Sequence, residues 1–516
     1  VNAFDSPSLS APFSEFPASG RFRVMRRMLL VSSVRISMRY LRLDTQALHT
    51  FIQRVYSDNL NTKLLDYRTV VEQFSSDLES LQSHQVPQWY DGAKFGIFVH
   101  WFVSTIPAFA PVSDDPFTLA AEKGEREAFT ESPYSEWYWN SLQTPGSPAA
   151  LHHAEKYGDQ PYEDFVPQFF EASQGWQPER WGELFAASGA KYCVMGTKHH
   201  DGVLLWPSKT PNPHKGSQWT STRDIVGECA EAVRSHGLRL GLYYSGGIDW
   251  TFQGLGIDGW ASLYTAIPQD DVYHAYVEAH YRELISRYAP DVLWNDIGYP
   301  GFGAGAADLF AHFYNTNPEG VVNDRFDFLG VMQGTAHADF VTPEYTTTPP
   351  LEGKKFEVCR GIGTSFGYNE QEDDSSYASS TELIHMLINI VAAGGNFLLN
   401  VGPMASGEIP WIQQERLLAI GQWLQVNGAA IYASHPHEIT ELRTSDGDTV
   451  RLTRGADGFT YAMVLGRPDS KNVSIAGLPA GDTYLLGYDH QLSRIGDDVI
   501  LPYRPDSSPA FTLRIA

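Results

Sequence analysis

Between residues 90 and 430, short runs rich in β-branched and aromatic residues alternate with segments of helical periodicity. This alternation constrains the fold most, because strands separated by helices form parallel sheets. We expect strands at Phe95–Trp101, Tyr192–Lys198, Leu238–Tyr244, Val292–Asp296, Val321–Asp324, Phe340–Tyr345, Phe356–Arg360 and Phe397–Val401. Helices are predicted between several of these strands, at Pro178–Ser188, Asp224–His236, Asp271–Arg287, Ala307–Tyr314 and Ser380–Ala393. The pattern predicts an α/β fold, a (β/α)₈ barrel of the TIM type with long βα loops.

The sequence changes character after a further predicted helix, Trp411–Val426. Short strand-like runs separated by Gly, Asp and Pro follow, at Thr449–Leu452, Tyr461–Leu465, Val473–Ile475, Tyr484–Gly487, Val499–Leu501 and Phe511–Ile515. This spacing predicts a small C-terminal antiparallel β-sandwich over residues 431–516, following a barrel over residues 71–430. The sandwich carries no catalytic constellation that we recognise, and we expect it to have a structural role.

Residues 1–70 do not share the alternating pattern of the barrel. Residues 1–22 are rich in Ser, Pro, Ala and Phe without a period, which predicts an N-terminal extension that is partly disordered. The segment Arg26–Val31 faintly resembles the start of a signal peptide, but its apolar part is short and no small-residue cleavage site follows. We therefore expect a cytoplasmic rather than a secreted location.

Charge and cysteine content exclude several classes of function. The net charge of −24 disfavours binding to nucleic acid or to an anionic membrane surface. No apolar run approaches the roughly 18 residues of a membrane span. The three cysteines form no Cys-x-x-Cys pair, so we expect neither a disulfide framework nor a zinc site. The sequence leaves open whether the protein forms a homo-oligomer.

Polar and aromatic side chains occur where the expected strands end. In a barrel of parallel strands, catalytic residues lie at this C-terminal face. The strand-end residues include His100, His199, His200, Tyr243, Trp294, Asp296, Arg325, Glu344 and Asn400. The long segment 102–175 adds an aromatic cluster around one acid, Tyr134–Tyr138, and a loop of that length is more often functional than idle.

A metal site is one chemistry that strand-end histidines can provide. A metal hydrolase built on a barrel would favour a His-x-His pair on the first strand, where only His100 is present. His199 and His200 are adjacent, and neighbouring side chains on an extended strand point in opposite directions. We therefore expect no metal and no other cofactor, and we expect the histidines to bind hydroxyl groups.

Two carboxylates at separate strand ends, Asp296 and Glu344, suggest glycoside hydrolysis, which needs a nucleophile or base and a protonated acid. Trp294 and Tyr345 would provide apolar walls that could raise the pKa of one carboxyl above that of the other. Taken alone, Asp296 is equally compatible with a cap that follows a buried strand, and Glu344 with an ordinary loop acid.

At these residues the chain resembles the α-L-fucosidases of glycoside hydrolase family 29. The matching segments run in order over residues 72–430: Trp89–Trp101, Glu136–Tyr138, Lys198–Gly202, Gly241–Ser245, Leu293–Asp296, Val322–Arg325, Pro343–Tyr345, Arg360–Gly363 with Ser365–Asn369, and Gly394–Asn396 with Leu398–Pro403. One fragment would be weak evidence, whereas the whole ordered set is specific. The sequence departs from the family at Phe102, where a Gly is common.

The resemblance implies a retaining exo-glycosidase that releases terminal α-L-fucose from a fucosylated oligosaccharide or glycoconjugate. It implies Asp296 as the nucleophile and, in the branch that this chain resembles, Glu344 as the general acid/base; Glu136 is the next candidate. The family's sugar-binding positions correspond to His100, Glu136, Trp137, His199, His200, Tyr243, Trp294 and Arg325. Phe98 and Phe366 correspond to residues that line the side of the sugar bearing its C5-methyl group.

Elementary chemistry agrees with this implication and leaves two alternatives. Imidazoles, an indole N–H and a carboxylate can pair with the three ring hydroxyls of fucose, and phenylalanines suit its methyl group. One alternative is another retaining exo-glycosidase, such as one acting on α-L-galactosides. The other is a sugar-binding barrel without catalysis.

Overall fold

The computed structural model describes residues 73–516 except 302, 304, 347–350, 352, 506 and 507, so the predicted extension over residues 1–70 lies outside the described residues. Its centre is a seven-stranded sheet in the order β5-β4-β3-β2-β1-β7-β6, in which every pair is parallel. The strands are β1 (Phe95–Val99), β2 (Tyr192–Lys198), β3 (Arg239–Ser245), β4 (Val292–Asp296), β5 (Val321–Val322), β6 (Glu357–Gly361) and β7 (Asn396–Val401). These are seven of the eight expected strands, and the sheet has the curled form of a TIM-like barrel.

The expected strand Phe340–Tyr345 is wrong as a continuous strand. It forms isolated parallel bridges, Phe340 to Asn323 next to β5, and Val341 to Phe356 and Glu344 to Cys359 at β6. The segment therefore fills the gap between the two edge strands and closes the ring. Pro343 has no N–H to donate, and Tyr345 has a φ of 49°, so a regular ladder cannot continue here. This irregular segment carries Glu344.

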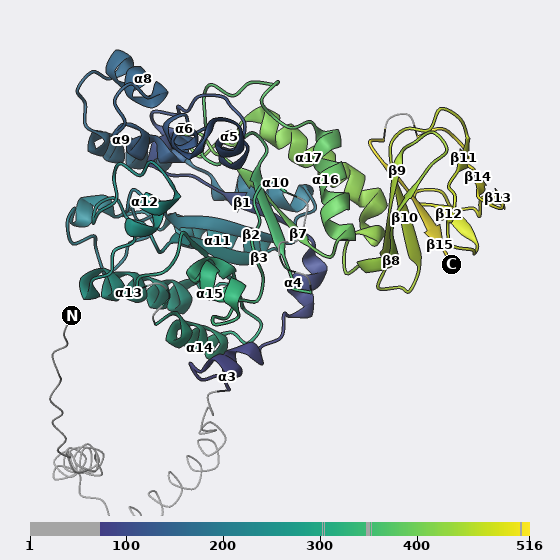
Figure 1. Cartoon of the computed structure of the whole chain (residues 1–516), viewed down its shortest axis with the longest axis horizontal. Helices are drawn as coiled ribbons and strands as arrows, with labels where there is room; N and C mark the ends of the chain where they lie inside the picture. Colours follow the sequence, from purple (N-terminus) through teal and green to yellow (C-terminus); the bar gives the residue numbers. More distant parts are fainter. Residues whose placement is uncertain (1–72, 302, 304, 347–350, 352, 506–507) are drawn as a thin grey trace, which may run out of the picture. The chain divides into compact units, whose positions relative to one another are not determined.

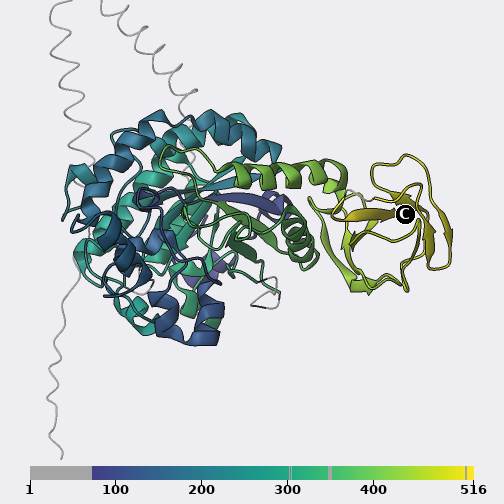
Figure 2. The ribbon, with the colours of Figure 1, turned by 90° about the horizontal axis from the view of Figure 1, so that it is seen from above.

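Helices surround the strands, as Figures 1 and 2 show. The principal ones are α10 (Pro178–Ala187), α11 (Ile225–Ser235), α13 (Asp271–Tyr288), α14 (Ala306–Thr316), α16 (Ser380–Ala392) and α17 (Trp411–Asn427). In α11, Asp224 caps the first turn by accepting from the Gly227 N–H, and the apolar stripe Ile225, Cys229 and Val233 is buried. Because helices cover the sheet, its strands are buried along almost their whole length.

Short helices outside this ring precede β1, follow α17 or belong to long βα loops. Before β1 come α3 (Leu78–Gln82) and α4 (Gln88–Ala93), and after α17 comes η8 (Gly428–Ala430). The loop after β1 holds η2 (Val103–Thr105), α5 (Pro116–Lys123), α6 (Glu125–Thr130), η3 (Ser135–Trp137), α7 (Tyr138–Ser141), α8 (Pro148–Lys156), η4 (Tyr162–Asp164), α9 (Phe165–Ala172) and η5 (Ser173–Gly175). The loop after β2 holds η6 (Ser217–Trp219), the loop after β3 holds α12 (Trp260–Thr265), and the segment after β5 holds η7 (Asp324–Phe326) and α15 (Phe328–Gln333). The βα loops lie at the end of the barrel where an active site is expected.

The C-terminal region contains two antiparallel sheets around a hydrophobic core of its own. The larger has the order β12 (Thr483–Leu485), β15 (Phe511–Ile515), β10 (Thr460–Leu465), β9 (Thr449–Arg454) and β8 (His435–Arg443); the smaller has the order β11 (Asn472–Ser474), β14 (Asp498–Ile500) and β13 (Ser493–Ile495). The sequence pattern did not predict β8 and β13, which are largely exposed and lack the apolar run that marks the other strands. Hydrogen bonds from Trp423 Nε1 to the Ala510 carbonyl (2.8 Å) and from Thr453 Oγ1 to the Ala430 carbonyl (2.8 Å) join this region to the barrel. No helix in the described part of the chain is long and apolar enough to span a membrane.

Candidate active site

A cavity of about 920 Å³ opens where the barrel strands end, and all of the predicted site residues line it. They are Phe98, His100, Glu136, Trp137, His199, His200, Tyr243, Trp294, Asp296, Arg325, Glu344 and Phe366. They come from the ends of β1, β2, β3 and β4, from the irregular segment that closes the ring, and from loops. Folding of the barrel therefore brings together residues that are more than 200 positions apart in the sequence, such as His100 and Glu344.

One guanidinium joins the two carboxylates at the bottom of this cavity. Arg325 Nη1 donates to Asp296 Oδ1 at 2.9 Å, and Nη2 of the same side chain donates to Glu344 Oε1 at 2.6 Å. Arg325 Nε also donates to Thr342 Oγ1 at 2.9 Å, and its guanidinium lies 4.6 Å from the centre of the Trp294 ring. Since the guanidinium is planar and rigid, these contacts fix how the two acids face each other.

The environment of Glu344 shifts the pKa of its carboxyl group in opposing directions. Burial raises the pKa of Glu344, the nearby charge of Asp296 raises it further, and Arg325 lowers it; the net direction is upward. An acid with a raised pKa, next to a carboxylate held by the same arginine, has the arrangement of a general acid beside a nucleophile.

Asp296 is held by donors on both of its oxygens. The Tyr243 hydroxyl donates to Oδ2 at 2.9 Å, while the Ile297 N–H and Arg325 Nη1 donate to Oδ1 at 3.0 and 2.9 Å. The residue that follows, Ile297, has a φ of 54°, which is strained for a β-branched side chain. Hydrogen bonds from the Gly247 N–H to the Asp296 carbonyl and from the Gly298 N–H to the Arg325 carbonyl support this strained turn.

Hydrogen-bond partners set the tautomers of two histidines. Asn400 Nδ2 donates to the Phe366 carbonyl at 2.7 Å, so Asn400 Oδ1 accepts from His100 Nδ1–H at 2.7 Å. Similarly, the Ser245 hydroxyl donates to the Ile248 carbonyl at 2.8 Å and accepts from His200 Nδ1–H at 2.6 Å. Burial lowers the pKa of His100 to about 4 and lowers that of His200 well below its usual value. Both rings are therefore neutral at pH 7, and Nε2 of each is the ring nitrogen that can accept a hydrogen bond.

The expectation that His199 and His200 point in opposite directions is wrong. Both line the cavity, and their ring centroids are 3.9 Å apart. The strand alternation does not apply to them because β2 ends at Lys198. Burial also lowers the pKa of His199 well below its usual value, and the neighbouring His200 and His100 lower it further.

The loop after β1 contributes an acid and an indole. Glu136 accepts from the Gly367 N–H at 2.8 Å, and burial raises the pKa of its carboxyl to about 7. The Trp137 ring packs edge-on against the His200 ring, with centroids 5.2 Å apart. Both side chains line the cavity, so the site depends on the long insertion as well as on the barrel.

An apolar corner lies beside these polar groups. The Phe98 ring is 4.8 Å from that of Trp294, 5.6 Å from that of Tyr243 and 6.3 Å from that of Phe366, as measured between centroids. The Trp294 indole N–H donates to Glu357 Oε1 at 3.0 Å in the barrel interior. The Trp294 N–H is therefore not free to bind a hydroxyl.

Comparisons with known proteins agree with this geometry. The family model described as alpha-L-fucosidase matches residues 65–429. The chain is 34% identical over 432 residues to mouse tissue alpha-L-fucosidase, covering 81% of this chain and 87% of that protein. It is 31% identical over 474 residues to the alpha-L-fucosidase of Dictyostelium discoideum, covering 86% of this chain and 92% of that protein.

The chain belongs to the α-L-fucosidase family. A solved structure of the Thermotoga maritima alpha-fucosidase in complex with fucose is 38% identical, covers 86% of this chain and 100% of that chain, and superposes with a TM-score of 0.75. The TIM-like barrel predicted from the sequence is thus also the fold of a solved member of the family.

Several residues that support the site of this α-L-fucosidase family member were not predicted to have a role there. Asn400 was named only as a strand end, and Ser245 and Thr342 carried no signal beyond their position near strand ends. Tyr134 lines the cavity, and its buried hydroxyl has no hydrogen-bond partner among the described residues. Its position two residues before Glu136 was a signal that could have been used, since it belongs to the aromatic cluster.

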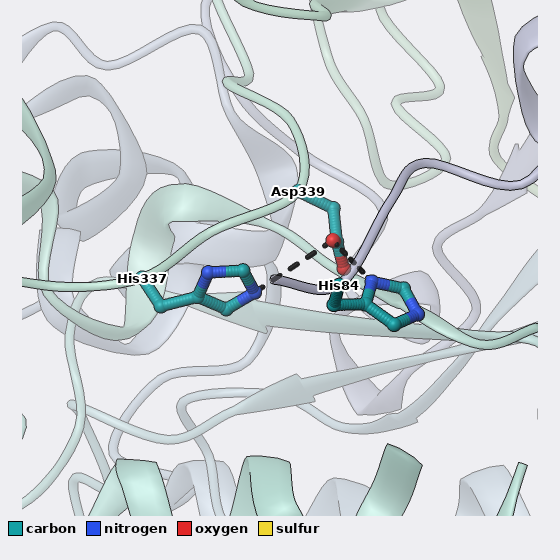
Figure 3. Close-up of side chains that lie close together, drawn as sticks. All are labelled: His84, His337 and Asp339. Carbon is teal, nitrogen blue, oxygen red and sulfur yellow. Dashed lines mark hydrogen bonds and ion pairs between the residues drawn. The ribbon is translucent and has the colours of Figure 1, made fainter. Parts of the chain in front are cut away.

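The cavity of this family member is separate from a buried cluster whose side chains have metal-ligand chemistry. Among the described residues, the group His84, His337 and Asp339 is the one whose ligand atoms all lie within 4.8 Å of one another. Both imidazoles point toward Asp339 in Figure 3. His84 Nδ1 lies 2.8 Å from Asp339 Oδ1, while Asp339 Oδ2 accepts from Tyr314 and from the Val322 N–H. These hydrogen bonds occupy the carboxylate, so we interpret the cluster as a structural network that ties the segment before β1 to the barrel.

Proposed function

We propose that the chain is a retaining, exo-acting α-L-fucosidase that hydrolyses terminal α-L-fucose from fucosylated oligosaccharides or glycoconjugates by double displacement. The observation that carries this proposal is the pair of carboxylates, Asp296 and Glu344, joined by Arg325 at the bottom of a cavity that neutral histidines and phenylalanines also line. The family to which the chain belongs and its fold support the same function.

Asp296 is proposed as the nucleophile. Its donors hold the carboxylate in one orientation at the end of β4, where it can attack the anomeric carbon and form a glycosyl ester. As the ester forms, the carboxylate of Asp296 loses its negative charge. The Tyr243 hydroxyl and the Arg325 guanidinium then face a neutral ester.

Glu344 is proposed as the general acid/base. In the first step its carboxyl group donates a proton to the glycosidic oxygen, and the upward direction of its pKa shift favours that role. In the second step the resulting carboxylate of Glu344 removes a proton from water, which attacks the anomeric carbon, and the bond to the Asp296 oxygen breaks to release the sugar and regenerate the carboxylate. A retaining mechanism requires the two carboxyl groups to be about 5–5.5 Å apart, and a shared guanidinium is compatible with such a short separation.

The remaining lining explains recognition of a 6-deoxy sugar. Neutral His100 and His200 can each accept a hydrogen bond from a sugar hydroxyl through Nε2, and Glu136 can also accept one. Phe98 and Phe366 provide an apolar surface for the methyl group, whose burial contributes about 0.8 kcal/mol. A sugar with a 6-hydroxyl would bury that hydroxyl against these rings without a partner, at a cost of about 1–3 kcal/mol.

The direct test combines substrate, stereochemistry and one substitution. The protein should release p-nitrophenol from the α-L-fucoside far faster than from the α-L-galactoside, and the first sugar product seen by NMR should be the α-anomer. Asp296→Asn should lower kcat by more than about 10³-fold while the melting curve is retained.

A matched control is Asp327→Asn, which changes another acid of the same cavity. Asp327 caps α15 through the Gly330 N–H, a role that Asn also fills, so this variant should keep its activity within a few fold. An inactive wild-type protein that still binds fucose would instead support a sugar-binding barrel. Preference for the galactoside would support the other alternative.

A further inference from the structure

The cavity extends well beyond the residues assigned to the sugar. Its outer part is lined by apolar side chains from helices that the barrel does not require, namely α5, α6, α12 and α15. We call this outer part the apolar rim, and define it by Phe117, Phe129, Trp260, Leu263, Phe328 and Leu329.

Side chains of the apolar rim are much more exposed to solvent than those that line the sugar site. Phe117, Phe328 and Leu329 are 48%, 45% and 53% exposed, whereas Phe98 and Trp294 at the bottom are each 1% exposed. Large apolar side chains that cluster on an opening and stay this exposed have a cost in water, and they commonly mark a binding surface. A monosaccharide held at the bottom would leave them uncovered.

Ring contacts connect the rim to the sugar site without a break. The Phe117 and Trp260 rings lie parallel with centroids 5.7 Å apart, and Phe129 packs edge-on against Trp260 at 5.2 Å. Phe129 is in turn 6.0 Å from Trp137, which contacts His200. Phe117 on α5 and Phe129 on α6 thus both contact Trp260 on α12, and the three helices are labelled in Figure 1. Together they extend the aromatic wall from the sugar site to the rim.

Charge restricts what this surface can bind. Among the described residues that line the cavity, the acids are Glu136, Asp296, Asp324, Asp327 and Glu344, and Arg325 is the single Lys or Arg. Arg325 is already paired with Asp296 and Glu344. An anionic group in the rim would therefore find no free cation in this lining and would be repelled by a protein of net charge −24.

We propose that the apolar rim is the subsite for the aglycone, and that it selects a neutral aglycone with an extended apolar surface, such as an alkyl, acyl-chain or aryl group. The proposal rests on the fucosidase function, because the glycosidic oxygen must point from the sugar site toward the open end of the cavity. It adds the chemical class of the leaving group, which the sugar-binding residues do not determine.

The test uses fucosides that differ in the aglycone but not in leaving-group chemistry. Methyl, octyl and 7-carboxyheptyl α-L-fucosides all release primary alcohols. A fully buried methylene should raise kcat/KM by about fourfold, so the octyl fucoside should exceed the methyl fucoside by more than tenfold. The terminal carboxylate should remove most of that gain.

Two matched substitutions locate the effect. Leu329→Ser should lower the octyl-to-methyl ratio by about three- to tenfold and leave the methyl fucoside unchanged. Leu151→Ser, on α8 and 62% exposed but outside the cavity, should change neither substrate. Trp260→Ala should lower the ratio in the same way, and melting curves should show that all three variants are folded.

The outcomes separate the two levels of the proposal. Equal kcat/KM for methyl and octyl fucosides, in a protein that cleaves the p-nitrophenyl fucoside, would overturn the aglycone subsite and leave the fucosidase function intact. An octyl preference that Leu329→Ser and Trp260→Ala do not reduce would overturn the assignment to the rim. No cleavage of any fucoside would overturn both.

Discussion

Replacing Arg325 by Met should reveal how far the shared guanidinium organises catalysis. The substitution keeps a long side chain next to Trp294 and removes the charge together with both hydrogen bonds to Asp296 and Glu344. Glu344 then loses the one nearby charge that lowers its pKa, while burial and Asp296 continue to raise it.

The magnitude follows from the two hydrogen bonds that the substitution removes. A hydrogen bond to a charged group contributes about 1.5–3 kcal/mol, so two of them amount to about 3–6 kcal/mol. Since a factor of ten corresponds to about 1.4 kcal/mol, kcat/KM should fall by about 10²–10⁴-fold. Arg325→Lys, which can keep a charge but not the fork of two donors, should give a smaller loss.

The assay is the pH dependence of kcat/KM for an aryl α-L-fucoside. Glu344 acts while protonated in the first step, so a higher pKa should move the alkaline limb of the profile to higher pH in Arg325→Met. The control is Arg360→Met, because Arg360 does not line the cavity. A loss below tenfold, or an alkaline limb that stays in place or moves to lower pH, would refute this account of Arg325.

Two further substitutions test the acid/base and the buried network around Asp339. Glu344→Ala should harm substrates with poor leaving groups most, and azide should rescue turnover of activated aryl fucosides as the α-fucosyl azide; equal losses and no rescue would point to Glu136 instead. Asp339→Asn should lower the free energy of unfolding by about 3–5 kcal/mol near pH 5–6, whereas the exposed Glu441→Gln on β8 should cost less than about 1 kcal/mol. Burial raises the pKa of Asp339 but the hydrogen bonds from His337 and His84 lower it more, and burial lowers the pKa of His84 but Asp339 raises it more. The contribution of Asp339 to stability is therefore fully present above the unfolded-state pKa of Asp, near 3.9, and is lost as pH falls through the folded pKa of Asp339. The contribution of His84 is fully present below the unfolded-state pKa of His, near 6.5, and is lost as pH rises through the folded pKa of His84. The pair stabilises the fold most between these two limits. A variant whose melting temperature depends on pH as the wild type's does would contradict this.

Much of the fold could be predicted because the sequence patterns that indicate it are local. The apolar runs of β1, β2, β3, β4, β6 and β7 and the periodic stripes of their helices are properties of adjacent residues. The prediction of a continuous strand at Phe340–Tyr345 failed because Pro343 and the positive φ of Tyr345 interrupt the ladder, although the composition of this segment is that of a strand. Strand β8 was missed for the opposite reason, since its exposed residues show no apolar run.

The candidate site was predictable in its membership and not in its hydrogen bonding. Strand ends and the ordered resemblance named the residues that line the cavity, including Asp296 and Glu344. The sequence did not indicate that Asn400 and Ser245 set the tautomers of His100 and His200. It suggested an indole N–H for a hydroxyl without indicating which of Trp137 and Trp294 provides it, and the structure shows that the Trp294 N–H is bonded to Glu357.

The sequence by itself determined the order of seven barrel strands and of the main helices between them, the residues at the strand ends and the candidate pair of acids, because each depends on neighbouring residues or on an ordered set of motifs. Only the tertiary structure decided that Arg325 lies between the two acids, that adjacent His199 and His200 share a cavity, and that α5, α6, α12 and α15 contribute to one apolar rim. Apart from the histidine pair, these contacts join residues from separate segments of the chain. Their positions follow from closure of the barrel and from loop conformations, which no local periodicity encodes.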